Sequence, residues 1–375
     1  MNNYDIIIIG GGLAGLATAA HLIEHKKNPR ILVYDALEIG KGASAVPGGM
    51  VNPITGQRAN VAWRAESGMQ LLEQRLKILS TFEKRQLHLE NGVLRPAIDE
   101  ELSHNFRKAF KQGRWPKDWV IWMSPEEVTK KHPLLKSSYG ALFLSKGKVI
   151  DTPAYLEAYK NYLSKQGVDI ETGGPYQLEY DGQWVLDNRS KAFSAPRAVI
   201  ATGYKSRENK FWTDLPLNSV KGQLAVYECS RPVDTLPAVS AYGYIAPLVE
   251  QKLVVGSTYE HHFHDDSPDK QSARLLDQKL EELLPELYSH CKSVQQWSGI
   301  RATTPDRLPI VGHHPEHEHL FIYAGLGSKG LLYSEVVGKM LADHLLTGQA
   351  IPKEISLYRF SKYRELRRQA LEAQG

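Results

Sequence analysis

The amino-acid sequence predicts an α/β protein whose second domain is of the α+β type, and three observations lead to this prediction. Near the start, four consecutive isoleucines run into closely spaced glycines and then into a helix of small residues, as in a parallel βαβ unit. The centre of the chain is rich in Val, Tyr and Ile between Gly and Pro breaks, which is typical of an antiparallel sheet. Towards its end the sequence again runs from an apolar strand through a glycine-rich turn into a helix.

The composition is that of an ordinary globular protein, with 42% hydrophobic and 23% charged residues in a chain of 375, enough for two domains with large cores. The net charge of +4 is only mildly basic and is weak evidence for nucleic-acid binding. Because Cys229 and Cys291 are far apart in the sequence, we expect no disulfide framework and two small buried apolar side chains. Such cysteines favour a reducing, intracellular setting, so we expect a cytoplasmic protein.

The apolar stretch from Ile6 to Ala20 is not expected to span a membrane. A spanning helix needs about 20 apolar residues, whereas four glycines interrupt this stretch and charged residues and histidines follow it. The residues before it lack the basic region of a secretory signal, and no small-residue cleavage site follows an apolar region of that kind. We therefore expect a buried strand and helix and no membrane partner.

The stretch "YDIIIIGGGLAGLATAAHLIEHKKNPRILVYD" has the order strand, glycines, helix, strand and terminal acid. Gly10, Gly12 and Gly15 follow the first strand in G-x-G-x-x-G spacing, and Asp35 ends the second strand 20 residues beyond Gly15. This order is the dinucleotide-binding fingerprint and predicts a Rossmann-like domain. A glycine-rich turn without a ligand is the alternative, and the full context argues against it.

Each residue type of the fingerprint has a physical role. Gly10 permits a tight turn, Gly12 lets the backbone approach a pyrophosphate, and Gly15 lets the helix pack closely on the strand. The helix N-terminus presents unpaired N–H groups to phosphate, and Asp35 can accept hydrogen bonds from a ribose. The fingerprint alone does not distinguish FAD from NAD. The predicted contacts are Gly10, Gly12, Leu13, Ala14, Gly15 and Asp35.

The segment 40–57, "GKGASAVPGGMVNPITGQ", is rich in small residues and looks too irregular for a helix or a strand. A nicotinamide dehydrogenase would usually continue here with another crossover helix. A loop of small residues instead lets the backbone lie against a flat ligand, although part of the segment fits a flexible surface loop equally well.

At this point the sequence resembles a known family. The motifs "GGGLAGLATA", "VYD" and "GAS" are similar to the start of the D-amino-acid oxidase superfamily of flavoproteins, which includes glycine oxidase and sarcosine oxidase. Within it, "GASAVPGGMVNP", "SGIRATTPDRLPIVG" and "AGLGSKGLLYS" are most similar to the FAD oxidase half of the bifunctional tRNA 5-methylaminomethyl-2-thiouridine biosynthesis protein. The resemblance covers nearly the whole chain and is weak from about Gln70 to Tyr139.

The resemblance implies a Rossmann-like FAD-binding domain and a substrate domain built mainly on an antiparallel sheet. The FAD-binding domain is expected from residues 1–45, 140–215 and 300–375, and the substrate domain from residues 46–139 and 216–299. In the family the loop after the second strand lies over the flavin ring. The implied contacts in this loop are Ala43, Ser44, Ala45, Gly48, Gly49 and Met50.

Helical spacing and capping signals predict the helices of the middle region. Apolar residues at helical spacing predict a helix over 68–85. In "MSPEEVTKKHPLL", Ser124 and Glu127 form a capping-box pattern. A third helix, within "PAYLEAYKNYLSKQG", is expected to be capped by Asp151 or Thr152.

Two further strand ends carry glycine-rich turns that the family places at FAD. "AVIATG" predicts a strand ending in an ATG signature, and "LFIYAGLGSKG" predicts a strand, a turn and a helix from Leu331 to about Leu345. The resemblance implies that this helix end faces the flavin, where negative charge develops on reduction. The implied contacts are Thr202, Gly203, Gly325, Gly327, Ser328, Lys329, Gly330 and Leu331.

Arg301, Tyr244 and Lys329 are the candidate catalytic residues, the first two also as substrate-binding residues. The forked guanidinium of Arg301 can hold a carboxylate in two parallel hydrogen bonds, and the family has an arginine here for this purpose. Pairing of Arg301 with a structural acid is the alternative. Tyr244 matches a substrate-contacting position, although a tyrosine in a sheet often serves packing alone. Lys329 either stabilises reduced flavin, activates oxygen or is solvated.

No metal site is predicted, because "HHFHDD" at residues 261–266 is better explained as a loop after a strand. FAD is expected to bind without a covalent link, since "TTPD" lacks the cysteine of the covalent members. The basic C-terminal segment "YRFSKYRELRRQALEAQG" suits a solvated helix face, with contact to RNA phosphate as the alternative.

The sequence thus predicts an FAD-dependent amine or amino-acid oxidoreductase. A hydride would pass from the α-carbon of a substrate bearing a carboxylate to flavin N5, with oxygen as acceptor. The alternative is a tRNA wobble-uridine oxidase that removes a carboxymethyl group from 5-carboxymethylaminomethyl-uridine. The expected partner is a small amine or amino acid, tRNA stays open, and the sequence does not set the oligomeric state.

Overall fold

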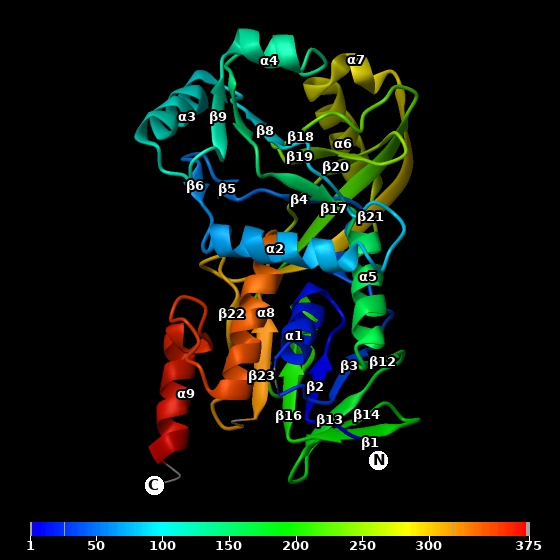
Figure 1. Ribbon diagram of the computed structural model, residues 1–375, viewed down its shortest axis with the longest axis vertical. Coiled ribbons are helices and arrows are strands. Elements are labelled where there is room, and N and C mark those ends of the chain that lie inside the picture. Colours follow the sequence, from blue (N-terminus) through cyan, green and yellow to red (C-terminus); the bar gives the residue numbers. More distant parts are fainter. Residues whose placement is uncertain (1, 26, 318, 373–375) are drawn as a thin grey trace.

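The computed structural model describes residues 2–25, 27–317 and 319–372. Its two large β-sheets occupy opposite halves of an elongated molecule, with α2 (Ala65–Leu79) lying between them (Figure 1). The mixed α/β architecture predicted from the sequence is confirmed. The predicted domain boundaries remain a prediction.

The six-stranded sheet is mainly parallel and is buried on both faces. All four isoleucines of its strand β2 are inaccessible to solvent, as expected for a parallel strand covered from both sides. Only its last strand, β22, runs antiparallel to its neighbour. In order across the sheet, the strands are β12 (Asp169–Thr172), β3 (Ile31–Asp35), β2 (Ile6–Ile9), β16 (Arg197–Ile200), β23 (Leu320–Ala324) and β22 (Ile310–His313).

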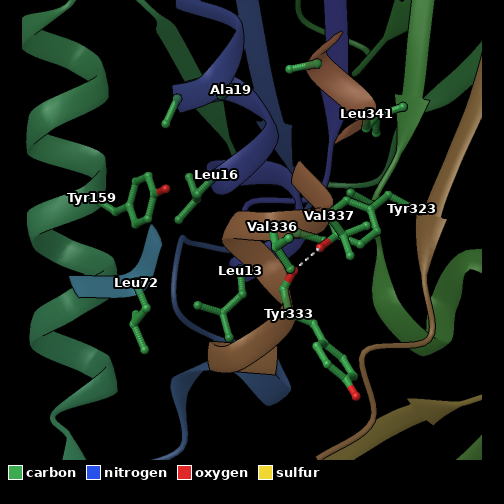
Figure 2. Close-up of a cluster of buried hydrophobic side chains, with 14 of the residues drawn as sticks. Leu13, Leu16, Ala19, Leu72, Tyr159, Tyr323, Tyr333, Val336, Val337 and Leu341 are labelled. Carbon is green, nitrogen blue, oxygen red and sulfur yellow. Dashed lines mark hydrogen bonds between the residues drawn. The ribbon is translucent and has the colours of Figure 1, made fainter. Parts of the chain in front are cut away.

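Helices cover one face of this sheet and a small sheet covers the other. The helical layer comprises α1 (Leu13–Ile23), α5 (Thr152–Lys165) and α8 (Gly330–Thr347). The opposite face packs against β1 (Asn2–Asn3), β15 (Ala192–Ala195), β14 (Trp184–Asp187) and β13 (Gln177–Tyr180). Figure 2 shows the core of the helical layer, where Leu13 and Leu16 of α1 meet Val336 of α8.

The eight-stranded sheet is antiparallel except where β18 and β8 run parallel. In order, its strands are β21 (Cys291–Thr303), β17 (Asn218–Cys229), β20 (Lys252–Gly256), β19 (Tyr244–Leu248), β18 (Ala238–Val239), β8 (Val93–Pro96), β10 (Ala141–Leu144) and β9 (Val120–Met123). Around it lie α3 (Glu100–Gln112), α4 (Pro125–Lys131), α6 (Lys270–Leu283) and α7 (Pro285–Tyr288) (Figure 1). The antiparallel sheet expected in the centre of the chain is confirmed.

Short elements complete the fold. The small strands are β4 (Gly49–Val51), β11 (Lys148–Ile150) and β7 (His88–Leu89) in one sheet, and β5 (Ile54–Thr55) and β6 (Asn60–Val61) in another. The remaining helices are η1 (Ala43–Ala45), η2 (Gly203–Glu208), η3 (Leu357–Arg359) and α9 (Ser361–Glu372). No helix in the described ranges has the length and apolar character needed to cross a membrane.

The predicted helix caps are confirmed, and one loop prediction is wrong. Ser124 and Glu127 form the expected capping box, and Asp151 rather than Thr152 caps α5 through the amide of Ala154. The segment 40–57 is not irregular throughout, because β4 within it pairs antiparallel with β11. Periodicity cannot reveal a strand of three residues whose partner lies far away in the sequence.

The prediction of two unlinked cysteines is also wrong. β17 and β21 pair antiparallel in a register that places Cys229 opposite Cys291, with the two Cα atoms 4.1 Å apart, and a disulfide joins them. Separation along the sequence was a poor guide because the two strands lie side by side. The argument from unlinked cysteines to a reducing, cytoplasmic setting therefore no longer holds.

A buried network of charged and hydroxyl groups joins α1, α2, α5 and α8. The fully buried carboxylate of Glu335 accepts hydrogen bonds from Arg75 Nε (3.1 Å) and from the hydroxyls of Tyr155 (3.1 Å) and Tyr159 (2.7 Å). Arg75 also donates from both terminal nitrogens to Glu24, at 2.5 and 3.1 Å. Buried charges are tolerated when they are paired and hydrogen-bonded in this way.

The network is expected to make stability depend on pH in the acid range. Burial raises the pKa of Glu24, but hydrogen bonds from His21 and Arg75 outweigh it and lower the pKa from 4.5 to about 2. Burial is likewise outweighed at Glu335, mainly by the charge of Arg75, so its pKa is also lowered. Because both pKa values are lower in the folded than in the unfolded protein, their stabilising contribution is present above pH 4.5 and is lost as the pH falls towards 2.

Denaturant unfolding at decreasing pH tests this dependence. The free energy of unfolding should fall as the pH drops below the unfolded pKa of the two carboxyl groups. Glu24→Gln should make that fall shallower, because one of the two groups then no longer titrates. Equal pH slopes for the variant and the wild type would contradict the assigned role of the network.

Candidate active site

A cavity of about 1660 Å³ lies between the two large sheets. One wall of the cavity is the edge of the six-stranded sheet where the carboxyl ends of β2, β3, β16 and β23 meet. Ligands bind at this edge in open α/β sheets. The opposite wall of the cavity comes from β17, β19 and β21 of the eight-stranded sheet. The fold thus brings together residues that lie far apart in the sequence.

The fingerprint glycines form one end of this cavity. Gly10 follows β2 with φ +119°, and a Cβ atom there would lie 2.3 Å from the carbonyl oxygen of Ala201. A Cβ atom on Gly15 would lie 1.9 Å from the carbonyl oxygen of Gly10, so Gly15 serves the contact of helix and strand and does not line the cavity. Gly12, the N-cap of α1, provides no capping side chain. The N-terminus of α1 is therefore suited to a phosphate.

Asp35 lies beside the fingerprint at the end of β3 and also lines the cavity. One carboxylate oxygen accepts from the amide of Gly11 at 2.7 Å and the other from the amide of Leu37 at 2.9 Å. Burial raises the pKa of Asp35 in spite of these hydrogen bonds. The fixed carboxylate keeps acceptor capacity for a ribose hydroxyl.

The loop after β3 forms a side wall. Ser44 Oγ accepts a hydrogen bond from the amide of Leu13 at 3.2 Å, which ties the loop to the start of α1. The predicted contact Ala45 packs against the hydrophobic core and, like Gly48, is not part of the cavity lining. The loop residues that do line the cavity include Ala43, Ser44, Gly49 and Met50.

The turn after β23 brings a second helix N-terminus to the same cavity. Gly325 and Gly327 have positive φ angles of +77° and +55°, and α8 begins at Gly330 without a side-chain cap. The lining residues of this turn include all those predicted: Gly325, Gly327, Ser328, Lys329, Gly330 and Leu331. Thr202 and Gly203 line the cavity beyond β16. Two helix N-termini whose N-cap residues make no side-chain cap, together with a glycine-lined wall, fit a long dinucleotide with a flat ring.

Lys329 is the basic side chain at this turn. It lines the cavity with its ammonium 5.9 Å from the ring centre of Tyr333. Burial lowers the pKa of Lys329, and the nearby charge of Arg307 acts in the same direction. Within the described part of the chain no carboxylate lies within 4.0 Å of this ammonium.

Arg301 projects from β21 into the cavity wall. Its Nη2 donates to Ser257 Oγ at 2.6 Å, its Nη1 donates to the carbonyl oxygen of Thr258 at 3.4 Å, and its Cζ lies 4.8 Å from the ring centre of Tyr259. Among residues 2–25, 27–317 and 319–372, no carboxylate lies within 4.0 Å of its nitrogens. The structural ion pair considered as an alternative is therefore absent from this part of the chain, and donors remain for an anion.

Tyr244 lines the cavity on the neighbouring strand β19. Its hydroxyl donates to the carbonyl oxygen of Gly48 at 2.9 Å, and burial raises its pKa. The tyrosine therefore fixes the side-wall loop, and its oxygen can still accept a hydrogen bond.

Several lining residues were not predicted from the sequence. Ser257, Tyr259 and Trp297 stand on or beside strands of the eight-stranded sheet, and Trp63 precedes α2. Strand register would have been needed to find Ser257 and Tyr259, which belong to no recognisable motif. Trp297, by contrast, directly precedes the segment "SGIRATTPDRLPIVG".

Among the residues that the structure describes, no histidine cluster adds a metal centre to this cavity. Residues 261–264 form an exposed loop, as predicted. A separate group, His314, Glu316 and His317, has its potential ligand atoms within 4.8 Å of one another. Both ring nitrogens of His314 are already engaged, by the carbonyl of Phe211 and the amide of Glu316. This leaves His314 without a lone pair for a metal.

Comparisons with known proteins agree with the geometry. A family model described as DAO, FAD dependent oxidoreductase, matches residues 5–344. The chain is 28% identical over 354 residues to glycine oxidase of Bacillus licheniformis, covering 92% of this chain and 93% of that protein. It is 27% identical over 369 residues to the tRNA 5-methylaminomethyl-2-thiouridine biosynthesis bifunctional protein MnmC of Thiobacillus denitrificans, covering 94% of this chain and 58% of that protein.

The fold gives the same result. The crystal structure of glycine oxidase from Geobacillus kaustophilus matches with a TM-score of 0.86 at 24% identity, covering 96% of this chain and all of that one. The predicted resemblance and the predicted cofactor, FAD, are confirmed. The chain belongs to the DAO family of FAD dependent oxidoreductases.

Proposed function

We propose that this FAD dependent oxidoreductase oxidises the C–N bond of a small amino acid or secondary amine that carries a carboxylate. The observation that carries the proposal is the guanidinium of Arg301, which lies in the cavity with no acidic partner in the described part of the chain. A charge in that position gains most from an anionic substrate group. The likeness to glycine oxidase supports the same substrate class.

The residues that would hold FAD extend along the glycine-lined wall. The N-terminus of α1 would take the pyrophosphate, Asp35 the ribose, and the turn 325–330 with the N-terminus of α8 the ring. Bound FAD supplies the hydride acceptor for the oxidation, with oxygen as the proposed final acceptor. Neither cysteine lines the cavity, so we expect no covalent link.

The chain itself contributes orientation and charge. Arg301 would grip the substrate carboxylate in two parallel hydrogen bonds, and Tyr244 would form the wall beside it. Lys329 and the N-terminus of α8 would place positive charge where negative charge develops on the reduced ring. Such a reaction depends more on positioning than on a strong base.

A second candidate substrate is a modified wobble uridine of tRNA. It is favoured by the similarity to MnmC, and the carboxymethylamino group of that nucleoside is glycine-like, so Arg301 would act in the same way. The chain spans 58% of the length of that bifunctional relative. Against this candidate, the basic residues near the C-terminus are largely engaged: Arg359 pairs with Asp306, and Arg368 with Glu365 and Glu372. A free amino acid or amine is therefore the first proposal.

Oxidation assays separate the two candidates. The purified protein should show a flavin spectrum and release hydrogen peroxide with glycine, sarcosine or proline. Accumulation of 5-carboxymethylaminomethyl-uridine in tRNA from a deletion strain, without turnover of free amino acids, would support the second candidate instead. A protein purified without flavin would contradict both.

A further inference from the structure

Arg301 reaches its position by crossing a neighbouring strand at a residue without a side chain. Arg301 of β21 pairs with Val220 of β17. Its guanidinium nevertheless lies over Gly222 of β17 and ends at Ser257, which follows β20. A Cβ atom on Gly222 would lie 2.2 Å from Nη2, 2.3 Å from Nη1 and 2.4 Å from Cζ of Arg301. The space that the guanidinium occupies is therefore the space that any other residue at position 222 would fill.

The backbone does not explain the glycine. Gly222 lies within the extended strand β17 and is not among the residues with positive φ, so its conformation is open to any L-amino acid. Val220 and Leu224, two positions away on either side, line the cavity on the same face of the strand. Accommodation of the guanidinium is thus the one structural demand for glycine that these contacts show.

Ser257 is the main hydrogen-bond partner of the Arg301 guanidinium. It is 6% exposed, and its Oγ accepts the shortest hydrogen bond of the guanidinium, at 2.6 Å. Thr258 adds a weaker backbone acceptor at 3.4 Å, and Tyr259 presents its ring face at 4.8 Å. All these partners are neutral, so they orient the guanidinium without neutralising its charge.

We propose that Gly222 and Ser257 are positioning residues that set the guanidinium of Arg301 for a substrate carboxylate and thereby determine selectivity for carboxylate-bearing substrates. This inference rests on the proposed function. A methyl group at position 222 meets only the far end of a flexible side chain, which can swing away. The substitution is therefore expected to disturb anion binding and to leave folding and FAD binding intact.

The test measures carboxylate binding directly, without relying on turnover. Acetate, a carboxylate without an oxidisable amine, is titrated into FAD-loaded protein while the flavin absorption spectrum is recorded. For Gly222→Ala we expect the Kd for acetate to rise at least about tenfold, the loss of one well-oriented charged hydrogen bond. FAD content and Tm should stay at wild-type values, which a merely structural role would not allow.

Four further variants serve as controls. Ser219→Thr adds a methyl group to the same strand on the opposite face and should bind acetate like the wild type. Ser257→Ala removes the hydrogen-bond acceptor and should weaken acetate binding, whereas Ser257→Thr keeps a hydroxyl and should restore most of it. Arg301→Ala sets the level at which the anion site is lost.

The outcomes distinguish this inference from the proposed function. If wild type responds to acetate and Arg301→Ala does not, while Gly222→Ala and Ser257→Ala bind like the wild type, the inference is wrong and the proposed function stands. If Gly222→Ala weakens acetate binding but also lowers the Tm or the FAD content, its effect is structural and the inference is overturned as well. If wild-type holoenzyme does not respond to acetate at all, the proposed function fails, and the inference fails with it.

Discussion

Replacing Arg301 by alanine is expected to raise KM for a carboxylate substrate by about two to three orders of magnitude. Truncating one partner of a buried, hydrogen-bonded charge pair costs about 2–5 kcal/mol, and each 1.4 kcal/mol is about a tenfold change in affinity. The guanidinium is bonded within the described chain only to neutral groups, so its removal leaves no buried acid unpaired. Steady-state kinetics with the best amino-acid substrate measures the effect.

Two comparisons make this result specific. Arg301→Lys keeps the charge but loses the planar fork, and should fall between the wild type and Arg301→Ala. An amine substrate without a carboxylate should be turned over equally by all three proteins. A KM close to the wild-type value in Arg301→Ala would remove Arg301 from the substrate site.

Replacing Arg75 by methionine is expected to lower the free energy of unfolding by about 3–5 kcal/mol, because removal of one partner leaves a buried charge uncompensated. The side chain of Arg75 is 2% exposed and that of Glu335 is 1% exposed, so water cannot take over the lost contacts. Denaturant unfolding followed by circular dichroism measures the change. A loss below about 1 kcal/mol would contradict the assigned role of the pair.

The double variant Arg75→Met, Glu335→Gln provides the control. It removes both charges, and the glutamine oxygen can still accept from Tyr155 and Tyr159. We expect it to be more stable than Arg75→Met alone, because neighbouring sites in one network are not additive. Simple additivity of the two substitutions would show that the charges do not interact.

Most of the predicted cofactor contacts line one cavity, and each of them belongs to a pattern that is local in the sequence. Gly10 follows β2 directly, Asp35 ends β3, and Gly203 and Gly327 lie in the turns after β16 and β23. Parallel strands bring their carboxyl ends to one edge. The residues that hold the Arg301 guanidinium, Gly222 and Ser257, were not predictable in this way. Their placement depends on which residues of β17 lie beside β21 and on which residues of β20 lie beside β17, and register across an antiparallel sheet is not a local pattern.

Other misses have the same physical origin. The disulfide depends on the pairing of β17 with β21, and β4 exists only through its pairing with β11. The helices α3 and α6 were also missed, although an aspartate caps each of them. The side chain of Asp99 accepts a hydrogen bond from the amide of Leu102, and that of Asp269 accepts one from the amide of Ser272. A capping aspartate before an amphipathic run was a usable local signal in both places.

The order of strands in the six-stranded sheet has a consequence for biosynthesis. β16 pairs with β2 on one side and with β23 on the other, so its second edge becomes paired only when β23, which begins at residue 320, has been synthesised. A ribosome-bound chain that has not yet exposed this strand would present the open edge of β16 to other chains. The same chain would lack the turn after β23 and the start of α8. Because these parts of the proposed FAD site are synthesised late, we expect cofactor capture to be a late event in synthesis.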